Sequence, residues 1–146
     1  MSLYTIKKSP VHGRGLYAKT DIPKGTAILE YKGLRCSWEE AAEHLIEDPI
    51  DPYHTFIMAL DSGLVIDGAR RGNAARYINH SCAPNCETIE DEHERVWIQA
   101  KKAIKAGTEL VYDYALTLPP RTAKKHRLGY VCRCGAKRCR GTMLKD

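Results

Sequence analysis

The sequence has no apolar run long enough to cross a membrane, and its first thirty residues lack the apolar stretch of a secretory signal peptide. It also contains no internal repeat and no low-complexity segment. Because nothing marks the chain for export or for a membrane, we expect it to act inside a cell. Its 146 residues fit one domain of ordinary size that can bury a core without disulfide bonds.

Charged residues are unevenly distributed, although the formal net charge is only +5. Residues 39–51 contain six carboxylates and no Lys or Arg, and residues 87–94 form a second acidic stretch. The basic excess lies in the tail from Arg121 to Lys145. The acidic stretches suit a cationic partner and the tail suits an anionic one, while solvated surface faces explain both patterns equally well.

Short strand patterns dominate the chain, so we predict a mostly β fold with short helices. One helix is expected after Ser37, which forms a capping box with Glu40, and its apolar face would include Trp38. The Gly13-Arg14-Gly15 sequence favours a tight loop, and residues 72–78 favour a helical turn. The strands are expected at residues 4–7, 26–31, 55–60, 64–67, 87–90, 95–100 and 109–114, and those at 87–90 and 95–100 are expected to pair around residues 91–93.

Residues 76–86, which read RYINHSCAPNC, bring together three side chains with donor, acceptor or metal-ligand character. Asn79 and His80 have the groups to read the edge of a flat heterocycle, and Cys82 can hold a metal as a thiolate. Pro84 makes the chain turn directly afterwards. A polar loop with one buried thiol is the alternative explanation of the same residues.

Three cysteines in the tail, Cys132, Cys134 and Cys139, have the spacing C-x-C-x4-C. Without a secretory signal, the six cysteines of the chain are better explained as metal ligands or free thiols than as disulfides. A structural zinc site is tetrahedral and favours thiolates, so three thiols need a fourth ligand. Spacing alone leaves the candidates open, and they are Cys36, Cys82, Cys86 and several histidines.

Five motifs follow one another along the chain in an order that resembles the SET-domain family of protein lysine methyltransferases. They are Gly13-Arg14-Gly15, EYKG at 30–33, RYINHSC at 76–82, ELVYDY at 109–114, and CRCGAKRC at 132–139, which resembles the family's post-SET tail. The resemblance covers nearly the whole chain. It implies a SET domain at residues 4–116 and a zinc-binding post-SET motif at residues 128–144.

The resemblance also implies a particular topology and metal site. The segment after RYINHSC would be threaded beneath ELVYDY as a pseudoknot, a topology that general rules of chain connectivity argue against. Cys82 would be the fourth zinc ligand, beside Cys132, Cys134 and Cys139. Cys36 and Cys86 would then be ordinary packing thiols.

By the same similarity, the cofactor would be S-adenosylmethionine. The loop backbone and Tyr53 would hold its amino-acid end, Asn79 would bond its ammonium group, and the backbone around His80 would read its adenine edge. A surface salt bridge is the alternative role for the two arginines. The implied cofactor-binding residues are Gly13, Arg14, Gly15, Tyr53, Arg76, Asn79 and His80.

Three tyrosines match the family's lysine channel, namely Tyr31, Tyr112 and Tyr114. Tyr114 corresponds to the catalytic tyrosine, whose hydroxyl would orient the lysine amine. Tyr112 occupies a position where relatives carry Phe or Tyr, and Phe there leaves room for further methyl groups. A tyrosine therefore predicts mainly monomethylation. Plain core packing is the alternative for a tyrosine in an alternating strand.

The resemblance thus implies a protein-lysine N-methyltransferase, with a histone tail as the leading candidate among protein or peptide substrates. Two rival interpretations are a catalytically silent, zinc-containing SET-like interaction module and a nucleic-acid binder that uses the basic tail. The chain lacks the cysteine-rich region that precedes the domain in many histone-directed relatives. We expect a cytoplasmic location if the protein is bacterial, and a nuclear or chromatin-associated one if it is eukaryotic or acts in a host.

Overall fold

The computed structural model describes residues 2–10, 13–43, 57–114, 137 and 139–140. Strands predominate over helices within these residues, so the predicted mostly β fold with short helices is confirmed. In chain order, the described elements are β1 (Tyr4–Lys8), β2 (Arg14–Ala18), β3 (Ala27–Tyr31), β4 (Leu34–Cys36), α1 (Trp38–Glu43), β5 (Ile57–Ala59), β6 (Val65–Asp67), the 3₁₀ helix η1 (Ala74–Tyr77), β7 (Asn79–His80), β8 (Cys86–Glu90), β9 (Val96–Ala100) and β10 (Val111–Tyr112).

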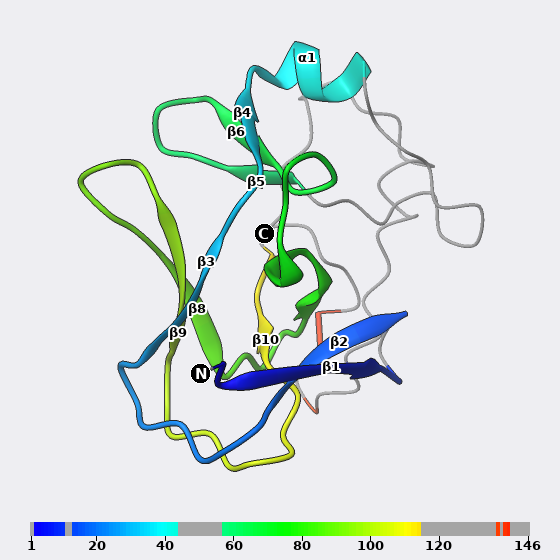
Figure 1. Ribbon diagram of the computed structural model, residues 1–146, viewed down its shortest axis with the longest axis vertical. Helices are drawn as coiled ribbons and strands as arrows, with labels where there is room; N and C mark the ends of the chain where they lie inside the picture. The colour runs from blue at the N-terminus through cyan, green and yellow to red at the C-terminus, as the bar shows by residue number, and fades with distance from the viewer. Residues whose placement is uncertain (1, 11–12, 44–56, 115–136, 138, 141–146) are drawn as a thin grey trace.

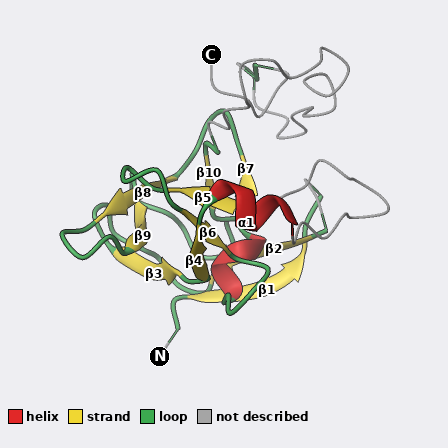
Figure 2. Ribbon diagram, turned by 90° about the horizontal axis from the view of Figure 1, so that it is seen from above, coloured by secondary structure: helices red, strands yellow, loops and turns green. Residues whose placement is uncertain are grey.

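The strands form four small sheets rather than one large one. Strands β1 and β2 form an antiparallel pair, and β3–β9–β8 and β4–β6–β5 are antiparallel three-stranded sheets. The fourth sheet pairs β10 with β7 in parallel. In two perpendicular views, β10 lies between the β3–β9–β8 sheet and the β1–β2 pair (Figure 1, Figure 2). The small sheets therefore surround β10 and β7.

One hydrophobic cluster fills the space between these sheets. Leu16 on β2, Ile98 on β9 and Leu110 just before β10 are fully buried within it. The backbone amide of Leu110 donates to the carbonyl of Leu16 at 2.7 Å, which joins β2 to the segment that leads into β10. Apolar burial therefore holds the segment before β10 in the centre of the molecule.

The predicted helix begins where its cap was expected. The Ser37 side chain accepts a hydrogen bond from the amide of Glu40 at 3.1 Å, and α1 follows directly. Its buried contact is Ala41, which packs against Cys36 and Val65. The prediction that Trp38 lies on the buried face is wrong, because its side chain is 46% exposed. No helix among the described residues is long and apolar enough to cross a membrane.

The hairpin predicted around residues 91–93 is confirmed as the connection between β8 and β9. Asp91 organises it by accepting hydrogen bonds from the Trp97 indole at 3.0 Å and from the amides of His93 and Arg95 at 2.9 Å each. These donors, the indole above all, hold the pKa of the Asp91 carboxyl well below its usual range. A single carboxylate thus fixes the turn.

Three strands were not predicted. Residues 14–18 form β2, so Arg14 and Gly15 of the expected tight loop belong to a strand, and only Gly13 retains a left-handed backbone, with φ of 45°. Strands β4 and β7 were also missed. All three strands are short, and their strand conformation depends on pairing with partners elsewhere in the chain: β2 with β1, β4 with β6, and β7 with β10.

Candidate functional site

The site is built on the parallel pairing of β7 with β10, which places Asn79 opposite Val111 and His80 opposite Tyr112. The Asn85 side chain braces this pairing. It donates to the carbonyl of Glu109 at 2.8 Å and accepts from the amide of Val111 at 3.0 Å. The RYINHSC and ELVYDY motifs therefore lie side by side. These contacts do not test the expected threading of the pseudoknot, which stays a prediction.

The three tyrosines singled out from the sequence are close to one another. The rings of Tyr112 and Tyr114 have centroids 4.9 Å apart, and Tyr31 and Tyr112 are almost completely buried. The Tyr114 hydroxyl donates to the carbonyl of Ile78. Burial raises the pKa of all three phenols, and their proximity to one another raises the pKa of Tyr31 and Tyr114 further. All three hydroxyls are therefore protonated at neutral pH.

His80 connects the two motifs through its ring. Its Nδ1 accepts the backbone N–H of Tyr114 at 3.0 Å, which assigns the imidazole proton to Nε2. Nε2 lies 3.4 Å from the sulfur of Cys82. Burial lowers the pKa of His80 to about 4, although Asp113 at 3.6 Å opposes that shift. The ring is therefore neutral and directs its N–H toward the Cys82 sulfur.

Asn79 is buried, and both of its amide protons are used. They bond the carbonyl of Arg14 at 3.1 Å and the carboxylate of Glu109 at 2.9 Å. The same carboxylate accepts the Ser9 hydroxyl at 2.8 Å. A Cβ at Gly15 would lie too close to this carboxylate, so a larger residue there would displace the Glu109 side chain from its present position. Glu109 thus joins β7 to the segments around β1 and β2.

The role of Glu109 was missed in the sequence, although the residue lies in a quoted motif. A signal for it was present. Glu109 stands directly before the apolar residues Leu110 and Val111, and a carboxylate at the start of a buried strand needs partners. The sequence did not reveal that these partners are Ser9 and Asn79, because they are 100 and 30 residues away.

The two arginines assigned to the cofactor meet at Tyr77. The guanidinium carbons of Arg14 and Arg76 lie 5.8 and 4.9 Å from the centroid of its ring, and Arg76 also donates to the Tyr77 hydroxyl at 2.9 Å. Neither arginine forms a salt bridge with a carboxylate in the part of the chain that the structure describes. Tyr53 lies outside the described residues.

Two of the four expected zinc ligands are described, and they are close together. The sulfurs of Cys82 and Cys139 are 4.0 Å apart. Two thiolates on one tetrahedral zinc ion, with bonds of about 2.3 Å, have sulfurs about 3.8 Å apart. Cys132 and Cys134 lie outside the described residues, and the described part of the chain contains no cluster of three candidate ligands.

Arg140 contacts the site directly. Its guanidinium donates to both carboxylate oxygens of Asp113, at 2.6 and 3.1 Å, and its backbone amide lies 3.3 Å from the Cys82 sulfur. Asp113 is the residue before Tyr114. Arg140 is thus tied to the segment that carries Tyr112 and Tyr114.

Comparison with known proteins agrees with this geometry. The sequence pattern of the family described as "SET domain" matches residues 13–115. The chain is 39% identical over 134 residues to the histone-lysine N-methyltransferase ash1 of Drosophila melanogaster. It is 36% identical over 138 residues to the H3 lysine-4 specific histone-lysine N-methyltransferase of Mycosarcoma maydis. It is 34% identical over 144 residues to histone-lysine N-methyltransferase 2B of Homo sapiens.

The three relatives are much longer than this chain. The aligned regions cover 90, 91 and 92% of this chain but only 6, 9 and 5% of the respective relatives. The similarity therefore concerns one small region of each of these proteins.

We predict that Glu109→Ala lowers the free energy of unfolding by about 1–3 kcal/mol, because it leaves the donors of Ser9 and Asn79 without this acceptor. Glu109→Gln keeps an acceptor oxygen and should cost less. Urea unfolding monitored by fluorescence measures both. Glu92→Ala is the control, since the Glu92 side chain is 86% exposed. If Glu109→Ala is as stable as that control, the carboxylate does not join these segments.

Proposed function

The chain belongs to the SET-domain family, and from this premise we propose that it is a protein-lysine N-methyltransferase that uses S-adenosylmethionine. The observation that carries the proposal is the pairing of β7 with β10. It brings Asn79 and His80 next to Tyr112 and Tyr114, so a polar cofactor-binding edge adjoins an aromatic channel. The family pattern covers residues 13–115, and we propose a SET domain at 4–116 followed by a post-SET motif at 128–144.

The residues around β2 and β7 fit the amino-acid end of the cofactor. Asn79 is held by hydrogen bonds from its amide group to Arg14 and Glu109, and its side chain also carries an amide oxygen, the kind of acceptor that an ammonium group requires. Gly13 and Gly15 allow the backbone to approach a ligand closely. When bound, S-adenosylmethionine would supply the electrophilic methyl group.

His80 and Arg76 are assigned to the cofactor because of where neighbouring residues hold them. The backbone of His80 is held by its pairing with Tyr112, and Arg76 is held by its stacking on Tyr77. Tyr53 keeps its proposed role from the resemblance alone. The full proposed set is Gly13, Arg14, Gly15, Tyr53, Arg76, Asn79 and His80.

Tyr114 is the proposed catalytic residue. Its hydroxyl gives its proton to the Ile78 carbonyl, so toward a lysine amine its oxygen acts as an acceptor. An amine that donates an N–H to this oxygen keeps its lone pair for the methyl group. Holding the nitrogen in such an orientation contributes to catalysis by positioning alone.

The aromatic cluster also favours the reactive form of the lysine. A free lysine amine has a pKa of about 10.4 and is charged at neutral pH, but it must be neutral to attack. The apolar surroundings formed by Tyr31, Tyr112 and Tyr114 disfavour the charged form, and their rings pack well against an aliphatic stem. Because the phenols themselves stay protonated, they add no negative charge that would stabilise the ammonium ion.

We propose a histone tail as the substrate. The names of the relatives support a histone, and the acidic stretch at residues 39–51 would attract a basic peptide. A nuclear or chromatin-associated location follows for a protein that modifies histones, while a bacterial protein would act in the cytoplasm. The basic tail that suggested a nucleic-acid binder lies largely outside the described residues.

A structural zinc ion is proposed at Cys82, Cys132, Cys134 and Cys139. The distance between the Cys82 and Cys139 sulfurs is close to that expected for two ligands of one zinc ion. The N–H of His80 and the amide of Arg140 both lie beside the Cys82 sulfur, where such donors stabilise a metal-bound thiolate. Zinc would then connect the tail to the residues of the site.

Tyr114→Phe is expected to lower kcat by about 100-fold or more, because it removes the oxygen that orients the amine. The affinity for S-adenosylmethionine should stay near that of the wild type. Methyl transfer from labelled S-adenosylmethionine to core histones and calorimetric binding measure the two effects. Full activity of the variant would refute the role of Tyr114. A separate outcome concerns the wild type: if it binds the cofactor but transfers methyl to no protein of a source lysate, the result would favour the catalytically silent, SET-like interaction module.

The wild type is expected to produce mainly monomethyllysine, since the Tyr112 ring lies beside that of Tyr114 and, by the family resemblance, a tyrosine at this position leaves less room than Phe for further methyl groups. Tyr112→Phe removes that hydroxyl and should increase the share of di- and trimethyllysine. Mass spectrometry of the product peptide distinguishes the three states. Trimethyllysine as the main product of the wild type would contradict the assignment of Tyr112.

The purified chain should contain about one zinc ion, and Cys139→Ser should lose most of it. Elemental analysis by mass spectrometry measures the metal content. Cys86→Ala is the matched control. Burial raises the pKa of the Cys86 thiol to about 12, so this cysteine is a poor ligand and its loss should leave zinc bound. Equal zinc in Cys139→Ser and the wild type would exclude Cys139 as a ligand.

A further inference from the structure

Two loops at one end of the molecule are rich in lysine. Residues 19–26 and 101–108 contain five lysines and one aspartate, which gives these loops a net charge of +4. All five lysines are exposed. We call this surface the lysine face, and it consists of Lys19, Lys24, Lys101, Lys102 and Lys105.

The backbone holds the two loops together. Ile22 and Ile104 exchange two backbone hydrogen bonds, at 2.7 and 2.8 Å, and both side chains are buried. The amide of Gly25 donates to the carbonyl of Ala100 at 2.8 Å, so the chain next to Lys24 lies against the chain next to Lys101. The lysines are thus displayed on a fixed scaffold.

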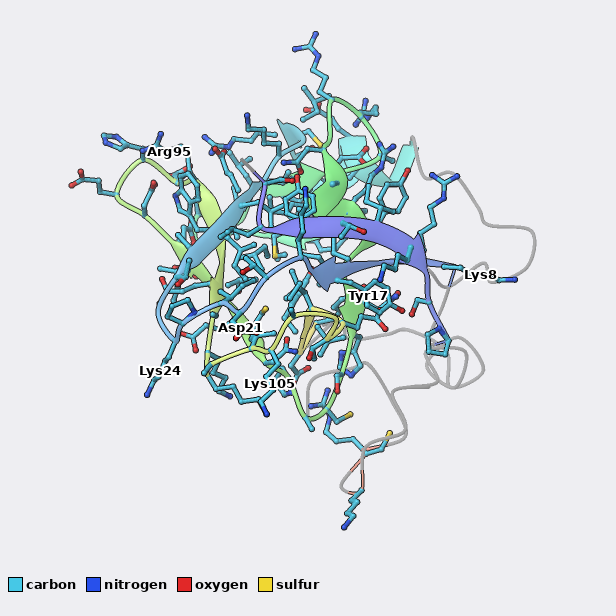
Figure 3. All side chains as sticks on the ribbon, turned by 60° about the horizontal axis from the view of Figure 1, so that its bottom comes forward. Lys8, Tyr17, Asp21, Lys24, Arg95 and Lys105 are labelled. Atoms are coloured by element: carbon cyan, nitrogen blue, oxygen red, sulfur yellow. The ribbon has the colours of Figure 1, made fainter. Side chains whose placement is uncertain are left out.

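Little negative charge opposes these lysines. Asp21 is the one acid in the two loops, and its carboxylate accepts the amide of Ala106 at 2.9 Å. In the part of the chain that is described, no carboxylate lies within ion-pair distance of any of the five lysines. Asp21, Lys24 and Lys105 lie toward one side of the molecule, and Lys8 extends from the other (Figure 3).

The composition of the lysine face distinguishes between anionic partners. Protein interfaces depend on aromatic and Arg side chains at their centre, and neither loop contains one. The apolar side chains Ile22 and Ile104 are buried and unavailable to a partner. Lysines surrounded by Thr, Ala and Gly present exposed point charges, and such a surface suits the repeated charges of a phosphate backbone.

We propose that the lysine face binds the phosphate backbone of duplex DNA without reading its sequence. This goes beyond the proposed methyl transfer and does not depend on it, since the five lysines are separate from the residues assigned to the cofactor, the lysine channel and zinc. An enzyme that modifies a DNA-bound protein would be held near its substrate by such a surface.

The test compares the binding of a fluorescein-labelled 24-base-pair duplex by the full chain and by Lys24→Gln/Lys105→Gln, using anisotropy from 25 to 200 mM salt. Each phosphate contact contributes about 0.9 to the slope of log affinity against log salt. The double variant should therefore reduce this slope by about 1.8, and methylation of a free peptide should remain unchanged. The matched control, Lys7→Gln/Lys8→Gln, removes the same charge from β1.

Three outcomes would overturn the proposal. The first is a wild type that does not bind the duplex at 25 mM salt. The second is a slope that falls equally in the lysine-face variant and in the control, which would show only the effect of net charge. The third is a loss of binding to poly-glutamate that matches the loss for DNA, which would assign the face to an acidic protein. None of these outcomes bears on methyl transfer, which the peptide assay measures separately.

Discussion

The site depends on a parallel ladder of only two residue pairs, between β7 and β10. So short a ladder has little stability of its own, and its surroundings hold it in place. The Asn85 side chain forms hydrogen bonds with the backbone of Glu109 and of Val111, the two neighbours of Leu110. Leu110 itself is fully buried against β2. Without this ladder, Tyr114 would not meet His80, and the RYINHSC and ELVYDY motifs would not lie side by side.

Buried polar groups make the ladder specific. Asn79, His80 and Asn85 are almost inaccessible to water, so their polar atoms must find partners inside the protein. Glu109 and the Tyr114 backbone supply some of these partners. A shift in register would leave several buried donors unsatisfied, and each would cost about 1–3 kcal/mol. The arrangement that satisfies these groups is also the one that aligns the site.

Charge is separated within the molecule in a way that suits the proposed chemistry. The three phenols of Tyr31, Tyr112 and Tyr114 and the imidazole of His80 are neutral, because burial shifts their pKa values away from the charged forms. The exposed lysines lie on loops outside the residues that form the channel. The surface lysines can therefore attract an anionic partner strongly. They do so without affecting the charge of a substrate lysine amine among the three tyrosines.

The sequence by itself determined the features that depend on near neighbours. These are the cap at Ser37 and the hairpin around Asp91. The tertiary structure decided which distant groups meet, such as Ser9 with Glu109 across 100 residues and Cys82 with Cys139 across 57. Pattern and propensity act over a few residues, whereas these contacts arise only when the buried core brings separate segments together.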